Sequence, residues 1–248
     1  MSSLAIEVKN LNKTFFVKKA ASATIREHAL GIFSKKNKKR AIQALTDISF
    51  TVKEGEFFGI IGKNGSGKST LLNVLIGALP GDKNSIITTK GKIIRLALGM
   101  GFDPNLTARD NIYVNSSILG LSFKRVGLIF DDIIGFAELE DFVDVPLKGF
   151  SKGMQAKLKF SIAVHAEADI FLMDEFGGGV GDISFKKKSE EVFKSTFMDG
   201  RTIVYVSHGM ESINEYCERV MILDKGQKVA MGGSNEMVQL YKDSYKDD

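Results

Sequence analysis

The chain has 248 residues, of which 44% are hydrophobic and 26% are charged, as in an ordinary water-soluble globular protein. Its net charge of +4 does not by itself indicate a nucleic-acid partner, and the lone Cys217 excludes a disulfide within the chain. No stretch approaches the roughly 18 apolar residues of a membrane span, and the N-terminus lacks the plan of a signal peptide. We therefore expect a protein of the cytosol, or one held at a membrane surface by partners.

Two strands separated by an insertion are predicted near the N-terminus. Apolar and polar residues alternate over residues 4–17, and residues 45–52 repeat the pattern. Between them, helical spacing of apolar residues predicts a short amphipathic helix, formed by Ile25, Ala29, Ile32 and Phe33. A basic run follows, made of Lys35, Lys36, Lys38, Lys39 and Arg40. This run is either a solvated loop or a patch that faces anionic lipid or an acidic partner.

The rest of the chain predicts alternating strands and helices. Residues 57–61 form a short, continuous apolar run, as in a strand buried on both faces of a parallel sheet. Similar strands are predicted at 170–173 and 202–206, a helix at about 68–78, mostly helical structure at about 105–165, and a hairpin of 220–223 and 227–231 before a terminal helix. This order predicts an α/β fold with a mainly parallel sheet, helices on both faces, and a separate helical subdomain.

Residues 62–69 match the phosphate-binding pattern G-x-x-x-x-G-K-[ST] in full. Glycines there let backbone N–H groups approach phosphate oxygens, and the helix that follows points its positive end at the anion. We expect Lys68 to reach the outer phosphates and Ser69 to offer its hydroxyl to Mg²⁺. The predicted nucleotide contacts are Gly62, Asn64, Gly65, Ser66, Gly67, Lys68, Ser69 and Thr70.

Two acids, Asp174 and Glu175, directly follow the predicted strand at 170–173. A carboxylate at that strand end can reach a metal held by the phosphate loop, so Asp174 is the predicted Mg²⁺ ligand. Glu175 is then placed to orient and deprotonate the attacking water. The alternative is a turn that happens to hold two acids, and the upstream phosphate loop argues against it. The second acid also favours an ATPase over a kinase.

A third motif, Phe-Ser-Lys-Gly-Met-Gln at residues 150–155, stands between the phosphate loop and the two acids. Through this motif the chain resembles ABC-transporter ATPase subunits, whose signature is roughly Leu-Ser-Gly-Gly-Gln. In that family the signature serine and glycine close on the γ-phosphate of ATP held by the opposite subunit, which assigns Ser151 and Gly153. The resemblance implies ATP and Mg²⁺ as ligands and a homodimer. It also implies a P-loop core with an antiparallel β-subdomain and a helical subdomain.

Two further residues are assigned by the resemblance. His208 follows the predicted strand at 202–206 and is similar to the family's switch histidine, which contacts the γ-phosphate. Without the other motifs, such a histidine would be an ordinary surface residue. Residues 11–15 resemble the segment that places an aromatic ring on adenine, which favours Phe15, with Phe16 as the second choice. Either ring could instead belong to the core.

One branch of the family, the polysaccharide exporters, matches more closely. Residues 101–113 resemble its G-F-x-P-x-L-T-x-R-x-N-I-Y stretch, and residues 158–163 and 180–182 fit the same branch. This branch exports capsule polysaccharide, O-antigen or teichoic acid. Its members carry an extra N-terminal segment near the membrane, which residues 18–40 fit. The resemblance implies a transmembrane permease as partner, no nucleic acid, and a position on the cytoplasmic face of the inner membrane.

Three departures from the family pattern stand out. The usual glutamine would fall near Leu98, yet residues 91–113 contain no Gln, so one Mg²⁺ contact and one communication route are unassigned. Residues 175–182 look one residue longer than usual and hold three consecutive glycines, which makes Asp182 hard to place as an inter-subunit contact. The chain is also too short for the C-terminal carbohydrate-binding domain of some relatives.

The sequence thus predicts one nucleotide-binding domain over residues 1–248 that hydrolyses ATP to power polysaccharide export. The alternative is a soluble ABC-type ATPase that is not coupled to transport, such as a translation or DNA-repair factor. Translation factors usually carry two cassettes and repair factors a long coiled coil, and the chain shows neither. A regulatory module without turnover is a third hypothesis, against which the intact Lys68, Asp174, Glu175 and His208 argue.

Overall fold

The computed structural model describes residues 3–18, 39–97, 101–177, 179–198 and 200–244. The strands are β1 (Leu4–Lys18), β2 (Lys39–Lys53), β3 (Phe57–Ile61), β4 (Ile86–Thr89), β5 (Ile93–Ala97), β6 (Ile170–Asp174), β7 (Thr202–Val206), β8 (Arg219–Asp224) and β9 (Gln227–Gly233). The α-helices are α2 (Lys68–Leu75), α3 (Ala108–Ile118), α4 (Phe123–Ala137), α5 (Lys152–Val164), α6 (Ile183–Phe197), α7 (Met210–Tyr216) and α8 (Ser234–Ser244). Two short 3₁₀ turns, η1 (Glu140–Phe142) and η2 (Leu147–Gly149), precede α5.

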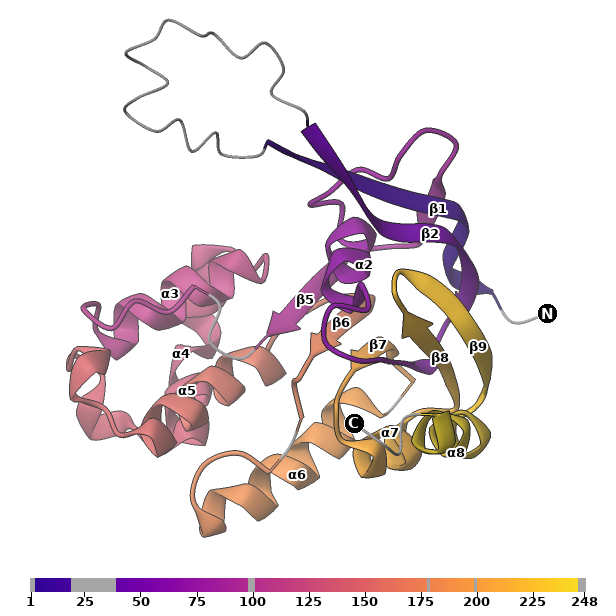
Figure 1. The fold of residues 1–248 in the computed structure, drawn as a ribbon. Coiled ribbons are helices and arrows are strands. Elements are labelled where there is room, and N and C mark those ends of the chain that lie inside the picture. The colour runs from indigo at the N-terminus through magenta and orange to yellow at the C-terminus, as the bar shows by residue number, and fades with distance from the viewer. Residues whose placement is uncertain (1–2, 19–38, 98–100, 178, 199, 245–248) are drawn as a thin grey trace, which may run out of the picture.

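The strands form two sheets, which lie one above the other in Figure 1. The larger sheet has the order β5-β6-β7-β3-β8-β9 and is parallel except for the final β8–β9 hairpin. The smaller sheet, β2-β1-β4, is antiparallel. The predicted fold class, a mainly parallel sheet with an antiparallel β-subdomain and helices, is confirmed.

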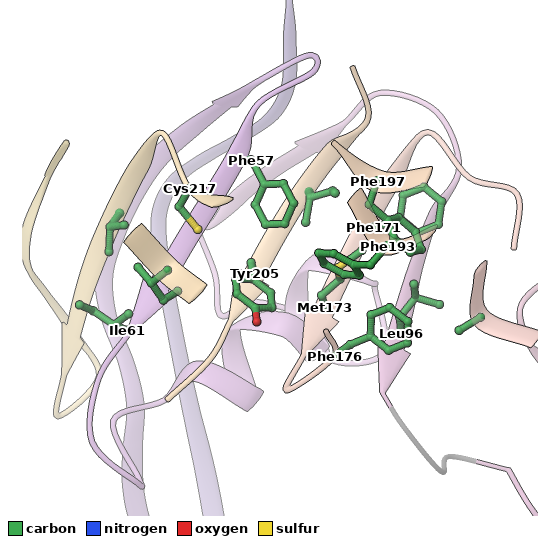
Figure 2. Close-up of a cluster of buried hydrophobic side chains, with 14 of the residues drawn as sticks. Phe57, Ile61, Leu96, Phe171, Met173, Phe176, Phe193, Phe197, Tyr205 and Cys217 are labelled. Atoms are coloured by element: carbon green, nitrogen blue, oxygen red, sulfur yellow. The ribbon is translucent and has the colours of Figure 1, made fainter. Parts of the chain in front are cut away.

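Each face of the larger sheet has its own apolar core. On one face, Phe57, Phe171 and Tyr205 pack with aromatic rings from α6, as Figure 2 shows. On the other face, Phe58 and Leu172 pack with α2 and the smaller sheet. Because successive strand residues point to opposite faces, a strand covered on both sides is apolar throughout. This explains the continuous apolar run of β3, in which all five residues are buried.

Helices α3, α4 and α5 form a lobe beside β5, which we call the helical lobe (Figure 1). Its core is separate from the two sheet cores and includes Ile112, Phe130 and Leu158. Helix α3 begins with a capping box in which Thr107 and Asp110 each accept a backbone N–H of the other. The helical content predicted for about 105–165 is therefore observed, as helices between residues 108 and 164.

Some predicted boundaries differ from the structure. Helix α2 ends at Leu75 rather than near Ala78, because Gly77 adopts a left-handed φ of 78° that a helix cannot continue through. Strand β2 starts at Lys39, so Lys39 and Arg40 of the basic run belong to a strand. The predicted amphipathic helix lies outside the described residues. Among the described helices, none combines the length and apolar character that a membrane crossing requires.

Candidate active site

The phosphate loop joins the buried end of β3 to α2 and depends on glycine at two positions. A Cβ at Gly62 would lie 2.1 Å from the Leu223 carbonyl oxygen. Gly67, just before α2, has a φ of 108° and approaches the Ala44 carbonyl so closely that a Cβ would lie 2.9 Å from it. Only glycine fits at either position, so the loop backbone can pack closely against these two carbonyl groups.

Lys68 is buried and folds back on the loop. Its Nζ donates to the carbonyl oxygens of Gly62 and Lys63, at 2.5 and 3.0 Å. Burial lowers the pKa of Lys68, and the negative charges of Glu175 and Asp174 oppose that shift. A buried ammonium beside a loop of N–H groups is suited to bind the oxygens of a phosphate chain.

The two acids lie at the end of β6, beside the end of β7. Asp174 pairs in register with Val206, and the Glu175 N–H donates to the Val206 carbonyl at 3.0 Å. Glu175 has a φ of 52°, a left-handed conformation that is uncommon for a residue with a side chain and often marks a functional site. Its Oε1 lies 3.6 Å from Nε2 of His208. The structure thus brings the predicted base and the predicted switch histidine together.

An open hollow of about 500 Å³ unites these groups. That volume lies in the usual range for small-molecule sites. Its walls come from the phosphate loop, the ends of β6 and β7, strand β2 and the β8–β9 turn: Ile42, Gln43, Ala44, Asn64, Gly65, Gly67, Lys68, Ser69, Thr70, Asp174, Glu175, Val206, His208, Lys225 and Gly226. Most of the predicted nucleotide contacts therefore face one space.

Five predicted nucleotide contacts do not line this hollow: Phe15, Gly62, Ser66, Ser151 and Gly153. Ser66 Oγ is buried without a hydrogen-bond partner among the described residues. Phe15 is half-buried, and Lys13 Nζ lies 5.5 Å from the centre of its ring. Phe15 pairs with Ile42 across β1 and β2, and Ile42 does line the hollow. Phe16, the second choice, is 67% exposed.

Ser151 and Gly153 lie at the start of α5 and do not line the hollow of their own chain. Ser151 is exposed and caps α5, because its Oγ accepts the Met154 N–H at 3.1 Å. A Cβ built at Gly153 would meet only Ser151 Oγ, at 3.7 Å. Within one chain the structure therefore keeps the signature turn apart from the phosphate loop.

Asp182 caps α6 and makes an ion pair within the chain. Its carboxylate lies 2.8 Å from Lys157 Nζ, and Lys157 also contacts Glu138 at 2.7 Å. The hydrogen bond from Lys157 holds the pKa of Asp182 below its ordinary value. This cluster joins α6 to the helical lobe. The prediction that Asp182 contacts another subunit stays a prediction.

Several residues at the site were missed by sequence reasoning, among them Lys225, Gly226 and Arg95. Lys225 and Gly226, at the tip of the predicted β8–β9 hairpin, form part of the wall of the hollow, and the Gly226 N–H donates to the Ser66 carbonyl at 2.9 Å. The Lys-Gly turn was visible in the sequence, but its contact with the phosphate loop was not. Arg95 on β5 is paired with Asp174, and no motif marks it.

The donor set fits a Mg²⁺ ion that arrives with a nucleotide. Ser69 and Asp174 both line the hollow and carry side-chain oxygens of the kind that bind Mg²⁺. No group of three or more His, Cys, Asp or Glu suited to a metal occurs in the described part of the chain. Mg²⁺ is commonly held by one or two carboxylates together with substrate phosphates and water, and this pair of side chains matches that habit.

Comparison with known proteins agrees with this geometry. The ABC transporter family matches residues 45–176. An O-antigen export system ATP-binding protein of Klebsiella pneumoniae is 42% identical over 206 residues, 83% of each chain. The ABC transporter protein AbcA of Aeromonas salmonicida is 36% identical over 97% of this chain and 77% of its own. A teichoic acids export ATP-binding protein of Lactococcus lactis is 38% identical over 97% of this chain, which spans 51% of that relative.

Solved structures show the same fold at lower identity. An ATP-binding subunit of an ABC transporter superposes with a TM-score of 0.68 at 22% identity, covering 96% of this chain and 93% of the other. A dimeric ATP-binding cassette in a post-hydrolysis state with ADP and Pi gives a TM-score of 0.67, also at 22% identity, covering 92% and 98%. The matched residues run from the middle of β2 through the phosphate loop and the two acids to residue 176. The chain belongs to the ABC transporter family and is an ATP-binding, ATP-hydrolysing member of it.

Proposed function

We propose that two copies of this chain hydrolyse MgATP between them and so power the export of a cell-surface polysaccharide through a transmembrane permease. The observation that carries the polysaccharide assignment is the match of nearly the whole chain to relatives named for O-antigen and teichoic acid export. The chemistry of ATP binding and cleavage is supported by the groups that face the hollow.

Binding would begin at the phosphate loop. Lys68 now donates to two carbonyl oxygens of its own loop, and phosphate oxygens offer it stronger, charged acceptors. The free N–H groups at the start of α2 point toward the same anion. Ser69 and Asp174 would hold Mg²⁺, which when bound neutralises charge on the phosphates. Phe15, placed opposite Ile42, would stack on adenine at the mouth of the hollow.

Cleavage requires a base for the attacking water, and we assign that role to Glu175. Its carboxylate is half-exposed, faces the hollow and lies 3.6 Å from His208 Nε2. The left-handed backbone at Glu175 fixes the direction of its side chain relative to Asp174. His208 would contact the γ-phosphate and keep Glu175 oriented. A positioned general base typically contributes about 10²–10⁴-fold to a rate.

A second copy would supply the groups that one chain lacks at its own site. Ser151 Oγ accepts the Met154 N–H, which leaves its hydroxyl proton available for a phosphate oxygen. Ser151 and Lys152 are exposed at the start of α5 and Gly153 is half-buried, so that a nucleotide held by another chain would approach the positive end of this helix. Closure of two chains would thus complete two sites and exclude water from them.

The test is a chromosomal Glu175→Gln variant in the source cell. We expect the variant to bind ATP and to co-purify with a permease from membranes. Its turnover should fall by about 10²–10⁴-fold, because an amide cannot take a proton from water. Surface polysaccharide, measured with a labelled lectin, should disappear while polymer accumulates inside the cell. Normal surface polysaccharide in cells whose purified variant has no ATPase activity would contradict the transport assignment and leave the ATPase assignment standing.

A further inference from the structure

Arg95 contacts Asp174 from outside the nucleotide hollow. It lies on β5, where Arg95 pairs with Leu172 and Ala97 with Asp174 on β6. Its guanidinium makes a short ion pair through Nη2 with Oδ2 of Asp174, and its Nη1 donates to Oδ1 of Asn73 on α2 at 2.7 Å. One side chain therefore joins β5, the helix of the phosphate loop and the carboxylate at the end of β6. Asp174 lines the hollow, and Arg95 does not.

The burial of this contact gives it a single geometry. The side chains of Arg95 and Asp174 are 18% and 20% exposed, so water screens the pair little and leaves little room for other rotamers. The planar fork of arginine directs its two donors at fixed angles toward two different acceptors. Arg95 Nε is buried without a partner among the described residues, which costs stability. The buried Nε thus lowers the stability of the fold at this point, and destabilising features of this kind are typical of functional sites.

Arg95 also shares a small cavity with residues of the helical lobe. With Phe102, Lys159 and Phe176 it lines a small cavity of about 40 Å³. Phe102 stands just before α3, and Lys159 Nζ lies 5.3 Å from the centre of its ring. Strand β5 leads into this segment, and the position near Leu98 expected for the family's glutamine lies outside the described residues. On this strand, Ala97 pairs with Asp174 through the backbone, and Arg95 contacts it through its side chain.

We propose that Arg95 is the positioning residue for Asp174: it holds the carboxylate in the orientation that binds Mg²⁺ and ties that orientation to the start of the helical lobe. This inference rests on the proposed Mg²⁺ site. It assigns a residue to the communication route that the missing glutamine leaves open, and leaves the glutamine's Mg²⁺ contact unassigned. Partners of metal ligands act in this way elsewhere, and removing one typically costs about 10–100-fold in metal affinity.

The experiment measures binding rather than turnover. A fluorescent ATP analogue is titrated into the purified full chain in EDTA and at increasing Mg²⁺, for the wild type and for Arg95→Gln and Arg95→Lys. We expect Arg95→Gln to bind the analogue in EDTA within about twofold of the wild type. Its Mg²⁺ midpoint should rise about 10–100-fold. Arg95→Lys, which keeps the charge but loses the fork, should fall between them.

Two controls fix the interpretation. Arg125→Gln removes an exposed ion pair with Glu167 on the helical lobe and should leave the Mg²⁺ midpoint unchanged. Asp174→Asn removes the ligand itself and should abolish the Mg²⁺ effect. A Mg²⁺ midpoint equal to that of the wild type in folded Arg95→Gln would overturn the positioning role. A lower Mg²⁺ midpoint would also overturn it, because the guanidinium would then only repel the cation. If Arg95→Gln does not fold, Arg95→Lys decides by the same criterion. A wild type that ignores Mg²⁺ would instead refute the metal site.

Discussion

Two helix N-termini in this chain carry the motifs that name its family, and they are built differently. The phosphate loop before α2 is buried: Lys68 is 8% exposed and bonded to two carbonyls, and Gly62 and Gly67 tolerate no Cβ. The signature turn before α5 is more open: Ser151 is exposed, and a Cβ at Gly153 would meet only Ser151 Oγ, at 3.7 Å. A rigid, buried turn suits a ligand bound within the chain, whereas an open turn suits a ligand that another chain presents.

Of the substitutions that distinguish the phosphate loop from the signature turn, Lys68→Ala should have the largest effect on nucleotide binding. The ammonium is buried, and its loss removes charged hydrogen bonds worth about 3 kcal/mol, or roughly 100-fold in Kd. Nucleotide affinity and turnover should both fall, as measured by titration with a labelled nucleotide and by phosphate release. Ser151→Ala serves as the contrast, because it should lose turnover while the single chain keeps its nucleotide affinity. Equal loss of affinity in both variants would contradict the division of roles.

Mixing those two variants tests whether the turns act between chains. A dimer of Lys68→Ala with Ser151→Ala would hold one site with both defects and one site with neither. The rate of phosphate release by the mixture should therefore exceed the sum of the rates of the separate variants. The share of mixed dimers sets which fraction of the wild-type rate it can reach. A mixture as inactive as its components, with mixed dimers demonstrated by crosslinking, would place both turns in one chain's site or require two intact sites at once.

Replacing one glycine by alanine beside the phosphate loop and one in the signature turn should show that the phosphate loop is the more rigid of the two. Gly226 supports the phosphate loop through its N–H and has a φ of 78°, and a Cβ there would lie 2.5 Å from the Ala44 carbonyl. We expect Gly226→Ala to lower the free energy of unfolding by about 1–3 kcal/mol, measured by urea denaturation. Gly153→Ala meets nothing closer than 3.7 Å and should unfold like the wild type while its turnover falls. A large loss of stability in Gly153→Ala would contradict the open turn.

The same contrast explains what sequence could predict. The alternation of strands and helices predicted the parallel sheet. The motifs predicted the phosphate loop, the two acids and His208, because each motif consists of neighbouring residues that follow a buried strand. Arg95 and Lys225 escaped prediction, because they reach the site from β5 and from the β8–β9 turn through the sheet order. The end of α2 was placed too late because Gly77 looks like any helix-tolerated glycine until its φ is known. The ion-pair cluster of Lys157 with Glu138 and Asp182 was not predicted for the same reason as Arg95, because its members are distant in sequence.

Removing this ion-pair cluster should have the smallest of the predicted effects. The cluster bears on the position of the signature turn. Lys157 lies on α5, the helix that begins at that turn, and it donates to Glu138 and Asp182, whose carboxyl pKa values it holds below their ordinary values. A lowered carboxyl pKa stabilises the fold fully above the unfolded pKa of about 4, and this stabilisation is lost as pH falls through the lowered folded value. The wild type should therefore unfold less readily than Lys157→Met at pH 6, and their difference should shrink below about pH 4. A difference that stays constant down to about pH 2.5 would show that the contact of Lys157 Nζ with the Phe185 ring, 5.0 Å from its centre, and not the two ion pairs, holds α5 to α6.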